Sequence, residues 1–231
     1  MKVVPIIPAL NPDERLIKIV DELIENDYKK IIIVNDGSNS DEIFKKIANN
    51  KECIVLKHDI NKGKGCALKT AFSYYKEHLM DKYQGVVTLD ADGQHKVSDI
   101  LNISQILLDN DMFILGTRLF NTKETPFRNK LGNRITSRIF KRLYKVYLKD
   151  TQTGLRAIPN RLIDLHLNSS GERFEYELNA LIDLVKNKEK IIQIDILTIY
   201  EKDNNKKSHY KVFNDSRKIY KVMFKRHKEK V

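Results

Sequence analysis

The segment Val86–His95 reads VVTLDADGQH and carries more information than any other stretch of this 231-residue chain. Its first four residues are apolar or β-branched and predict a short β-strand. Asp90 and Asp92 follow at positions i and i+2, so their side chains point to the same side of extended backbone. With Gln94 they offer oxygen ligands to Mg²⁺ or Mn²⁺ and leave positions open for the phosphates of a substrate. The alternative interpretation is a strand end followed by an ordinary polar Asp-Gly turn.

Strand-like and helix-like segments alternate along most of the chain. Short apolar runs predict strands, and the stretches between them have the spacing of amphipathic helices. This alternation predicts an α/β fold with a Rossmann-like, mostly parallel sheet flanked by helices. The predicted strands are residues 3–7, 31–35, 53–56, 86–89, 113–116 and 191–199, and the predicted helices are residues 12–26 (capped by Asn11-Pro12), 40–49, 66–80, 98–109, 129–148 and 172–186.

Polar residues cluster directly after several of the predicted strands. In a parallel sheet the carboxyl ends of the strands meet at one edge, where the ligands of such folds bind. We therefore expect one site built from several loops rather than a set of unrelated turns. The clusters are Pro8–Asn11, Asn35–Ser38, Asn61–Gly65, Asp90–Asp92 and Gly116–Arg118.

Phosphate-binding motifs of other folds are missing from the sequence. The chain has no Walker loop, and no Gly-x-Gly-x-x-Gly follows its first strand, which disfavours the usual dinucleotide-binding fold. Gly63 and Gly65 still allow the backbone to approach a nucleotide closely. Lys64 between them is a candidate to pair with the anionic nucleotide, and the alternative is an exposed lysine in a loop.

The charge of the chain is concentrated towards its C-terminal end. The formal net charge is +11, and residues 206–231 contain ten Lys or Arg against two acidic residues. This asymmetry predicts a domain over residues 1–205 and a basic C-terminal segment over residues 206–231 with an anionic partner. No apolar run reaches the ~18 residues of a membrane span, and two cysteines without metal-ligand spacing suit a reducing compartment. We therefore expect a cytoplasmic protein, with Val3–Leu10 as a strand and loop rather than a signal peptide.

Taken together, these motifs resemble family 2 glycosyltransferases of the GT-A fold. The resemblance covers about residues 2–225 and is closest to the branch that contains dolichyl-phosphate mannose synthases and bacterial polyprenyl-phosphate glycosyltransferases. The chain departs from many relatives in having Asn35 in place of a second Asp, Pro12 in place of Glu, and no membrane helices. Further stretches that match this branch are Asp150–Arg156, Gly171–Glu177, Ser208–Tyr210 and Asp215–Arg217.

The resemblance implies an inverting transfer of a hexose from a UDP- or GDP-linked sugar, with Mg²⁺ or Mn²⁺ as cofactor. It also implies a role for individual residues of this chain. Asp36 matches a contact to base and ribose, Asp90 the residue between ribose and metal, Asp92 and Gln94 metal ligands, Arg118 a phosphate contact, Pro8, Ala9 and Asn11 the lining of the nucleotide, and Ser208, His209 and Arg217 a loop that can close over the diphosphate.

The acceptor decides whether the reaction needs a general base. A lipid phosphate has a second pKa of about 6, is mostly dianionic at neutral pH, and needs only cations to hold it in line. The candidates are Arg118, Arg128, Arg134 and Arg138, with Arg128 and Arg134 as the preferred pair. The alternative for each of them is a place on a solvated helix face. A sugar hydroxyl of a cell-surface glycan would need a base, with Asp150 as first choice and Glu175 as second. Asp150 otherwise fixes the turn that follows it. The many arginines favour the polyprenyl phosphate.

The basic end of the chain has two interpretations. A basic amphipathic helix over Phe213–Phe224 can lie on an anionic membrane and would hold the enzyme peripherally at the inner face. Alternatively, the helix packs its apolar side on the domain. Two other functional classes are weaker: a sugar-phosphate nucleotidyltransferase, whose Gly-rich start is missing after the first strand, and a nucleic-acid-binding module, since no aromatic stacking motif interleaves with the basic tail. No nucleic-acid partner is expected.

Overall fold

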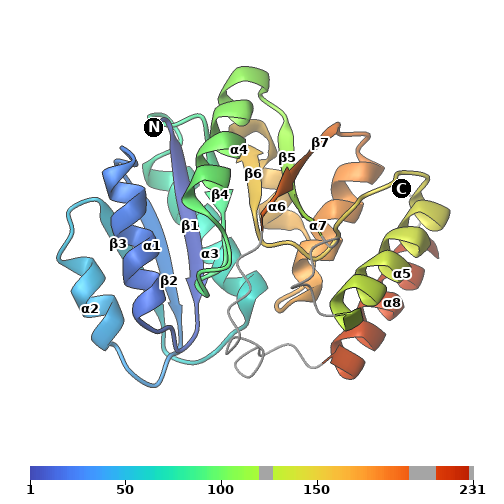
Figure 1. Cartoon of the computed structure of the whole chain (residues 1–231), viewed down its shortest axis with the longest axis horizontal. Coiled ribbons are helices and arrows are strands. Elements are labelled where there is room, and N and C mark those ends of the chain that lie inside the picture. Colours follow the sequence, from blue (N-terminus) through green and yellow to red (C-terminus); the bar gives the residue numbers. More distant parts are fainter. Residues whose placement is uncertain (120–126, 198–211, 229–231) are drawn as a thin grey trace.

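A computed structural model describes residues 1–119, 127–197 and 212–228 of the chain, and for residues 127–131 and 212–219 it describes the backbone alone. Seven strands form one sheet in the order β3-β2-β1-β4-β6-β5-β7, and helices cover both of its faces (Figure 1). The strands are β1 (Val3–Ala9), β2 (Ile31–Asp36), β3 (Cys53–His58), β4 (Gly85–Thr88), β5 (Phe113–Arg118), β6 (Arg156–Pro159) and β7 (Ile191–Ile196). The helices are α1 (Glu14–Glu25), α2 (Glu42–Ala48), α3 (Lys64–His78), α4 (Val97–Asn110), α5 (Phe127–Tyr144), the short 3₁₀ helix η1 (Asn160–Leu162), α6 (Ile163–Asn168), α7 (Glu175–Lys186) and α8 (Val212–Lys228).

All pairings in the sheet are parallel except those of β6, which runs antiparallel to β4 and β5. The predicted α/β fold with a mostly parallel sheet is therefore confirmed, and six of its strands lie where apolar runs predicted them. The sequence analysis missed β6, because Arg156 and Pro159 leave no apolar run across these four residues. It also missed η1 and α6, which follow β6 directly.

Side chains of the strands alternate between two hydrophobic cores, as the period of extended backbone requires. On β1, Val4 and Ile6 point into the core under α3, α5, α6, α7 and α8, while Val3 and Ile7 point into the core under α1, α2 and α4. All four are completely buried. This double cover explains why the strands read as nearly continuous apolar runs.

Several predicted helix ends were wrong by a few residues. The first helix begins at Glu14 with Asp13 as its N-cap, because the Asp13 side chain accepts the Arg15 backbone N–H, whereas Asn11 has a left-handed φ of 49°. Helix α5 ends at Tyr144 rather than at residue 148, since the next residue, Lys145, has a φ of 63°.

The predicted helix over residues 172–186 begins only at Glu175. The carboxylate of Glu175 accepts the backbone N–H groups of Glu172 and Arg173, both at 3.2 Å, in the turn before α7. The strand predicted over residues 191–199 ends at Ile196, and its last two residues lie outside the described part of the chain.

The C-terminal helix α8 packs against α5 and α7. Met223 on its inner side is completely buried, as in the interpretation that the helix packs on the domain. The predicted boundary between residues 205 and 206 lies outside the described residues and stays a prediction. Within the described ranges, the molecule has no helix with both the length and the apolarity needed to cross a bilayer.

Candidate active site

The parallel strands bring their carboxyl ends to one edge of the sheet, at the bottom of Figure 1. The Asp-x-Asp segment that follows β4 lies at this edge, next to the end of β1 and the beginning of the antiparallel β6. Arg118 is the last residue of β5 at the same edge. Ligands of open α/β sheets bind at this position, so the fold places the predicted polar clusters where a site is expected.

Lys64, Asp90 and Glu177 form a compact charged cluster. Lys64 Nζ lies 2.6 Å from Asp90 Oδ1 and 3.0 Å from Glu177 Oε1, so one ammonium group bridges carboxylates that follow β4 and belong to α7. Burial alone would raise the pKa of Asp90, but the charge of Lys64 and the neighbouring His95 hold it well below its usual range. Burial likewise opposes the charge of Lys64, yet the two carboxylates raise its pKa above its ordinary value. Lys64 and Asp90 therefore both stay ionised at neutral pH.

Asp92 differs from Asp90 in its electrostatics. Its Oδ1 accepts the backbone N–H of Gln94 at 3.1 Å, which closes the Asp-Gly turn. Burial and the neighbouring charge of Asp90 raise the pKa of Asp92, because no described cation pairs with it. A second positive charge at this position would relieve the repulsion between the two carboxylates.

The residues at the end of β4 fit a divalent cation as a partial ligand set. Asp90 and Asp92 supply carboxylate oxygens, which hard cations prefer, and Gln94 supplies an amide oxygen. Within the described residues no group of three or more His, Cys, Asp or Glu side chains could hold a metal ion by itself. The set therefore suits a cation that is completed by substrate phosphates rather than one enclosed by protein.

Arg118 and Asp150 form a buried, two-point ion pair. Arg118 Nε lies 2.6 Å from Asp150 Oδ2, and its Nη2 donates to Oδ1 at 3.1 Å. The Asp150 side chain is completely buried and also accepts the backbone N–H of Gln152 at 3.0 Å. Both oxygens are thus committed, and the geometry makes Asp150 a residue that orients Arg118 and fixes the following turn.

The chain matches the sequence model of "Glycosyl transferase family 2" over residues 6–165. The chain belongs to glycosyl transferase family 2. It is 36% identical over 215 residues to a UDP-N-acetylglucosamine–dolichyl-phosphate N-acetylglucosaminyltransferase from Methanococcus voltae, covering 84% of each protein. It is 24% identical over 214 residues to a dolichyl-phosphate β-glucosyltransferase from Trichomonas vaginalis, covering 83% of this chain and 64% of that protein.

The structure of glucosyl-3-phosphoglycerate synthase from Mycobacterium tuberculosis, solved with Mn²⁺, UDP and phosphoglyceric acid, shares the fold. It aligns with a TM-score of 0.72 and 16% identity, covering 100% of this chain and 80% of that one. The predicted GT-A fold is therefore confirmed, as is the predicted family.

In this family 2 glycosyltransferase, Asp36 ties the glycine-rich loop to the end of β2. Its Oδ1 accepts the backbone N–H of Lys62 at 2.9 Å and lies 2.7 Å from His58 Nδ1, while Oδ2 accepts the N–H of Gly63 at 2.8 Å. The contact to base and ribose that the resemblance implies for Asp36 stays a prediction. The sequence analysis missed His58, whose position at a strand end gave no distinct signal.

Pro8 and Ala9 end β1 and pair in register with Val34 and Asn35 of β2. Asn11 then links the loops of both strands: its backbone N–H donates to Ser38 Oγ at 2.8 Å, and its Oδ1 accepts the N–H of Asn39 at 2.9 Å. The polar clusters after the first two strands thus form one structure, as predicted, and their contact to a nucleotide stays a prediction.

The glycines around Lys64 are required by protein packing. A Cβ at Gly63 would lie 2.6 Å from Glu172 O, and one at Gly65 would lie 2.6 Å from Tyr176 Cβ. The loop therefore lies directly on the turn that precedes α7. This contact brings the Lys64 side chain within ion-pair distance of Glu177. The close contact of this loop with the protein itself explains both glycines, so their presence is not evidence for a bound nucleotide.

Three further residues of the site were missed as functional candidates: Glu177, Gly154 and Arg156. Gly154 lies against Asp90, so that a Cβ on it would be 2.8 Å from Asp90 Cγ. The buried Arg156 donates from Nε to Thr153 O at 3.0 Å and from Nη1 to Glu177 O at 2.7 Å. The stretch Asp150–Arg156 was noted for its resemblance, but only the fold shows that it covers Asp90.

The remaining candidates belong to α5, to the turn before α7 and to the C-terminal segment. Arg134 is exposed on α5, and Arg128 lies in the first turn of that helix, with a side chain outside the described part. Glu175, the second choice for a base, accepts two backbone N–H groups before α7. Ser208 and His209 lie outside the described residues, as does the side chain of Arg217 in α8.

We expect Arg118 and Asp150 to behave as one unit. Asp150→Asn and Arg118→Gln should each lower transfer and stability, because either change breaks the two-point contact between the guanidinium group and the completely buried carboxylate. The double variant should be no worse than the worse single variant, with an interaction free energy of about 1–3 kcal/mol in a double-mutant cycle of urea unfolding. As a matched control, the exposed pair Lys76 and Asp164 should give an interaction of about 0.5 kcal/mol or less. Additive effects at Arg118 and Asp150 would contradict the pairing.

Proposed function

We propose that this family 2 glycosyltransferase moves a sugar from a nucleotide sugar to a polyprenyl phosphate, with inversion and with Mg²⁺ or Mn²⁺. The observation that carries the proposal is the similarity to the N-acetylglucosaminyltransferase of Methanococcus voltae over 84% of both chains. That protein's name specifies UDP-N-acetylglucosamine and dolichyl phosphate. UDP-N-acetylglucosamine is therefore the first donor to test, ahead of other UDP- or GDP-linked hexoses.

The donor half of the reaction is supported by the cluster at the end of β4. A divalent cation bound by Asp90, Asp92 and Gln94 would stabilise the negative charge that develops on the leaving diphosphate. Lys64 keeps Asp90 ionised and in place through a 2.6 Å contact, so the carboxylate is ready as a ligand. The solved structure that shares this fold contains Mn²⁺ and UDP, which supports the same chemistry here.

The acceptor half of the reaction is supported by the commitment of Asp150. Its two oxygens are engaged by Arg118 and by the Gln152 N–H, which disfavours Asp150 as a general base. A phosphate dianion needs no such base, because it attacks the anomeric carbon with its own negative charge. Arg118, Arg128 and Arg134 would hold this dianion on the face of the sugar opposite the leaving group. Attack from that face inverts the configuration.

We test the proposal by comparing acceptors. Transfer from labelled UDP-N-acetylglucosamine should be strong with a short-chain polyprenyl phosphate and at least about 10²-fold weaker with the matching polyprenyl alcohol, because the alcohol requires a base to remove its proton. A thermal-shift panel of nucleotide sugars with Mn²⁺ identifies the donor independently of the acceptor.

The opposite result would favour a second function. If the alcohol or a free glycan is the better acceptor and Asp150→Asn is inactive, the enzyme is a hydroxyl-directed glycosyltransferase with Asp150 as base.

We also propose that the protein lies peripherally at the cytoplasmic face of a membrane, where a polyprenyl-phosphate acceptor would be presented. The basic C-terminal segment supports this placement by its charge.

A further inference from the structure

The outer side of α5 carries a row of cations that form no ion pair with the acidic side chains in the described part of the chain. Residues 127–149 contain eight Lys or Arg and no Asp or Glu. Arg138, Lys141 and Arg142 lie at the i, i+3 and i+4 spacing of one helix face, and Lys145 follows directly after the end of α5. All four are exposed, and none of them forms an ion pair with a described acidic side chain. A surface of this kind repels itself unless an anionic partner covers it.

Helix α8 continues this basic surface. Tyr144 of α5 donates its hydroxyl to the backbone oxygen of Met223 at 2.8 Å, and its ring meets that of His227 edge-on at 5.8 Å. Figure 1 shows the two helices side by side at one end of the molecule. The outward residues of α8 in the described part are Lys221, Phe224, Lys225, His227 and Lys228, all exposed.

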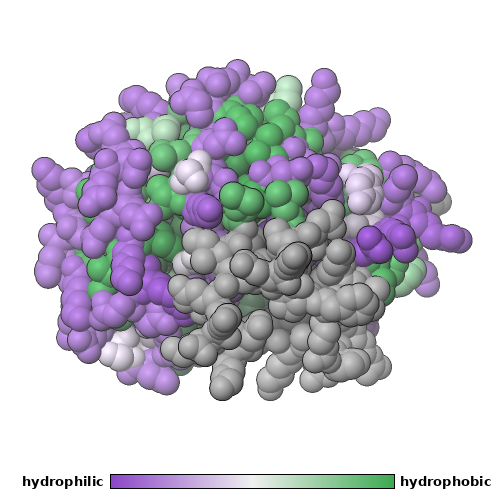
Figure 2. All heavy atoms as spheres, viewed as in Figure 1, coloured by the Kyte–Doolittle hydropathy of each residue, from purple (hydrophilic) through white to green (hydrophobic). Residues whose placement is uncertain are grey.

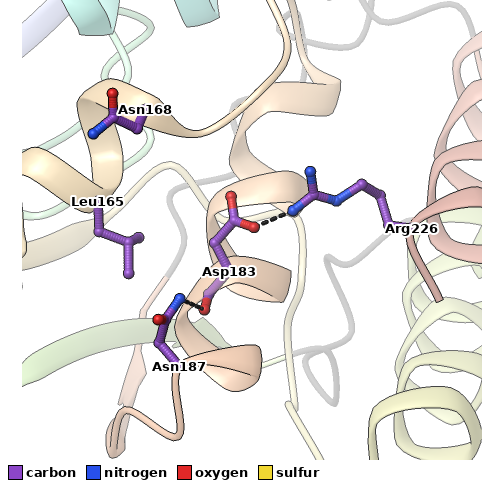
Figure 3. A pocket seen from close by; sticks show the side chains of 5 residues that line it. All are labelled: Leu165, Asn168, Asp183, Asn187 and Arg226. Atoms are coloured by element: carbon purple, nitrogen blue, oxygen red, sulfur yellow. Dashed lines mark hydrogen bonds and ion pairs between the residues drawn. The ribbon is translucent and has the colours of Figure 1, made fainter. Parts of the chain in front are cut away.

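The position of α8 is fixed by contacts on its other flank. Arg226 forms an ion pair with Asp183 of α7 at a pocket of about 310 Å³ between α6, α7 and α8 (Figure 3). Asp183 also accepts the Ser169 hydroxyl at 2.8 Å. Since Arg226 and Met223 face the domain, the exposed residues Phe224, Lys225 and Lys228 point towards solvent. The basic surface is therefore part of the folded domain.

Large apolar side chains are exposed among these cations. The exposed fractions are 39% for Ile135, 52% for Tyr147 and 50% for Phe224. Lys141 Nζ lies 5.8 Å from the centre of the Tyr147 ring, so aromatic and cationic groups alternate at the surface. Cations surrounding exposed aromatic and aliphatic side chains are the pattern of surfaces that lie in the headgroup region of anionic bilayers. A nucleic acid would neutralise the cations but would leave the exposed aliphatic side chain of Ile135 without a favourable contact.

We propose that the outer faces of α5 and α8 together dock this enzyme on the anionic lipid headgroups of a membrane, with α5 as the main contact. The inference rests on the proposed function, because a polyprenyl phosphate is presented at such a surface. It also differs from docking through the C-terminal segment alone, since α5 belongs to the glycosyltransferase domain itself.

The inner side of α5 connects this surface to the site. Asn133 Nδ2 donates to Lys149 O at 2.6 Å, and Asn133 Oδ1 accepts the Thr151 N–H at 3.4 Å. These bonds hold the segment that carries Asp150, the partner of Arg118. The helix that carries the basic surface is thus bonded directly to the segment that positions Arg118.

The test uses two triple variants of the full chain with equal loss of charge. The first is Lys141→Gln, Arg142→Gln and Lys145→Gln on α5, and the control is Lys18→Gln, Lys51→Gln and Lys82→Gln, three exposed lysines elsewhere. The probes are vesicles of phosphatidylcholine alone and of phosphatidylcholine mixed with phosphatidylglycerol. Wild type and control should co-sediment with the anionic vesicles at low salt, and the α5 variant should bind about 100-fold more weakly, since each cation contributes about 1 kcal/mol.

Phe224→Ser separates apolar insertion from charge. This variant keeps every cation, and we expect it to bind anionic vesicles several-fold more weakly than wild type. At 1 M salt, where screening acts over about 3 Å, all variants should be released.

Three results would overturn the docking surface: equal vesicle binding by the α5 variant and the control, equal binding of wild type to neutral and anionic vesicles, or tight binding of wild type to nucleic acid without binding to vesicles. Transfer to a short-chain polyprenyl phosphate in detergent is measured in parallel. If that transfer survives while vesicle binding fails, the proposed function stands and the surface is wrong. If vesicle binding holds and transfer fails, the surface stands and the proposed acceptor is wrong.

Discussion

Asp92→Asn is expected to lower sugar transfer by about 10²–10³-fold, the usual cost of removing one group that stabilises developing charge. The fold should be at least as stable as that of the wild type. An asparagine oxygen can still accept the Gln94 N–H that Asp92 Oδ1 now accepts at 3.1 Å, so the turn is retained. The variant also removes a charge that burial and Asp90 disfavour, as the raised pKa of Asp92 indicates. Function and stability therefore move in opposite directions.

The stability gain has a defined pH dependence. A carboxyl whose pKa is raised in the folded state destabilises the fold when it is ionised, so the penalty is present at neutral pH and disappears below the unfolded pKa of about 3.9. In EDTA, the difference in melting temperature between variant and wild type should thus be largest near neutral pH and vanish in acid. Asp81→Asn, at an exposed position, is the control and should change neither property. Wild-type turnover in the variant, or wild-type activity that survives excess EDTA, would contradict the metal role.

The sequence predicted the sheet well where strands are buried on both faces and poorly where they are not simple apolar runs. The first four residues of β2, Ile31–Val34, form an apolar run because both faces of the strand are covered, and no long-range information is needed to find it. β6 lies in the middle of the same sheet, yet it contains Arg156. Its guanidinium is tolerated there because backbone oxygens of Thr153 and Glu177 accept its N–H groups. Those acceptors are supplied by the fold, so no local pattern predicts the strand.

The same limit applies to the site. Asp90 and Asp92 could be located at a strand end from their spacing alone. The bridge from Lys64 to Glu177 could not, because Glu177 lies on α7 and resembles an ordinary polar residue of an amphipathic helix until the glycine-rich loop packs on that helix. The sequence left two roles open for Asp150, a base for a hydroxyl acceptor or a residue that fixes the following turn, and its pairing with Arg118 was not predicted. Spacing predicts where a side chain lies, and only packing shows whether its charge is free to react.

The basic C-terminal segment illustrates a third case. Its composition predicted a helix with one apolar side. The structure has a helix over Val212–Lys228, and Met223 on it packs on the domain. The exposed part of the same helix then joins α5, whose charge is diluted in the sequence by the apolar residues that face the core. A charge count along the chain points to the tail alone, whereas the folded surface adds the exposed cations of α5.

Gly154→Ala is expected to lower transfer by about 10²-fold, because the added methyl group would displace Asp90 from its position by a fraction of an ångström to an ångström. The new Cβ would lie 2.8 Å from Asp90 Cγ and closer still to its Oδ2. Asp90 has little freedom to yield, since Lys64 holds its other oxygen at 2.6 Å. The backbone of Gly154 is also fixed, as its oxygen accepts the Thr88 hydroxyl at 2.8 Å. The steric conflict therefore falls on the carboxylate that would bind metal and donor.

Gly132→Ala provides the matched control, because a Cβ at Gly132 in α5 meets nothing within 4 Å. This variant should keep full activity and gain about 0.5–1 kcal/mol in stability from the better helix propensity of alanine. Gly154→Ala should lose about 1–3 kcal/mol from overpacking and still unfold cooperatively, which separates the loss of activity from loss of the fold. The measurements are transfer rate, Mn²⁺ affinity by electron paramagnetic resonance, and urea unfolding for both variants. Weaker Mn²⁺ binding by Gly154→Ala alone would show that the stretch Asp150–Arg156 positions the carboxylate of Asp90. Wild-type affinity and transfer in Gly154→Ala would mean that Asp90 shifts freely and that this stretch has no part in holding it.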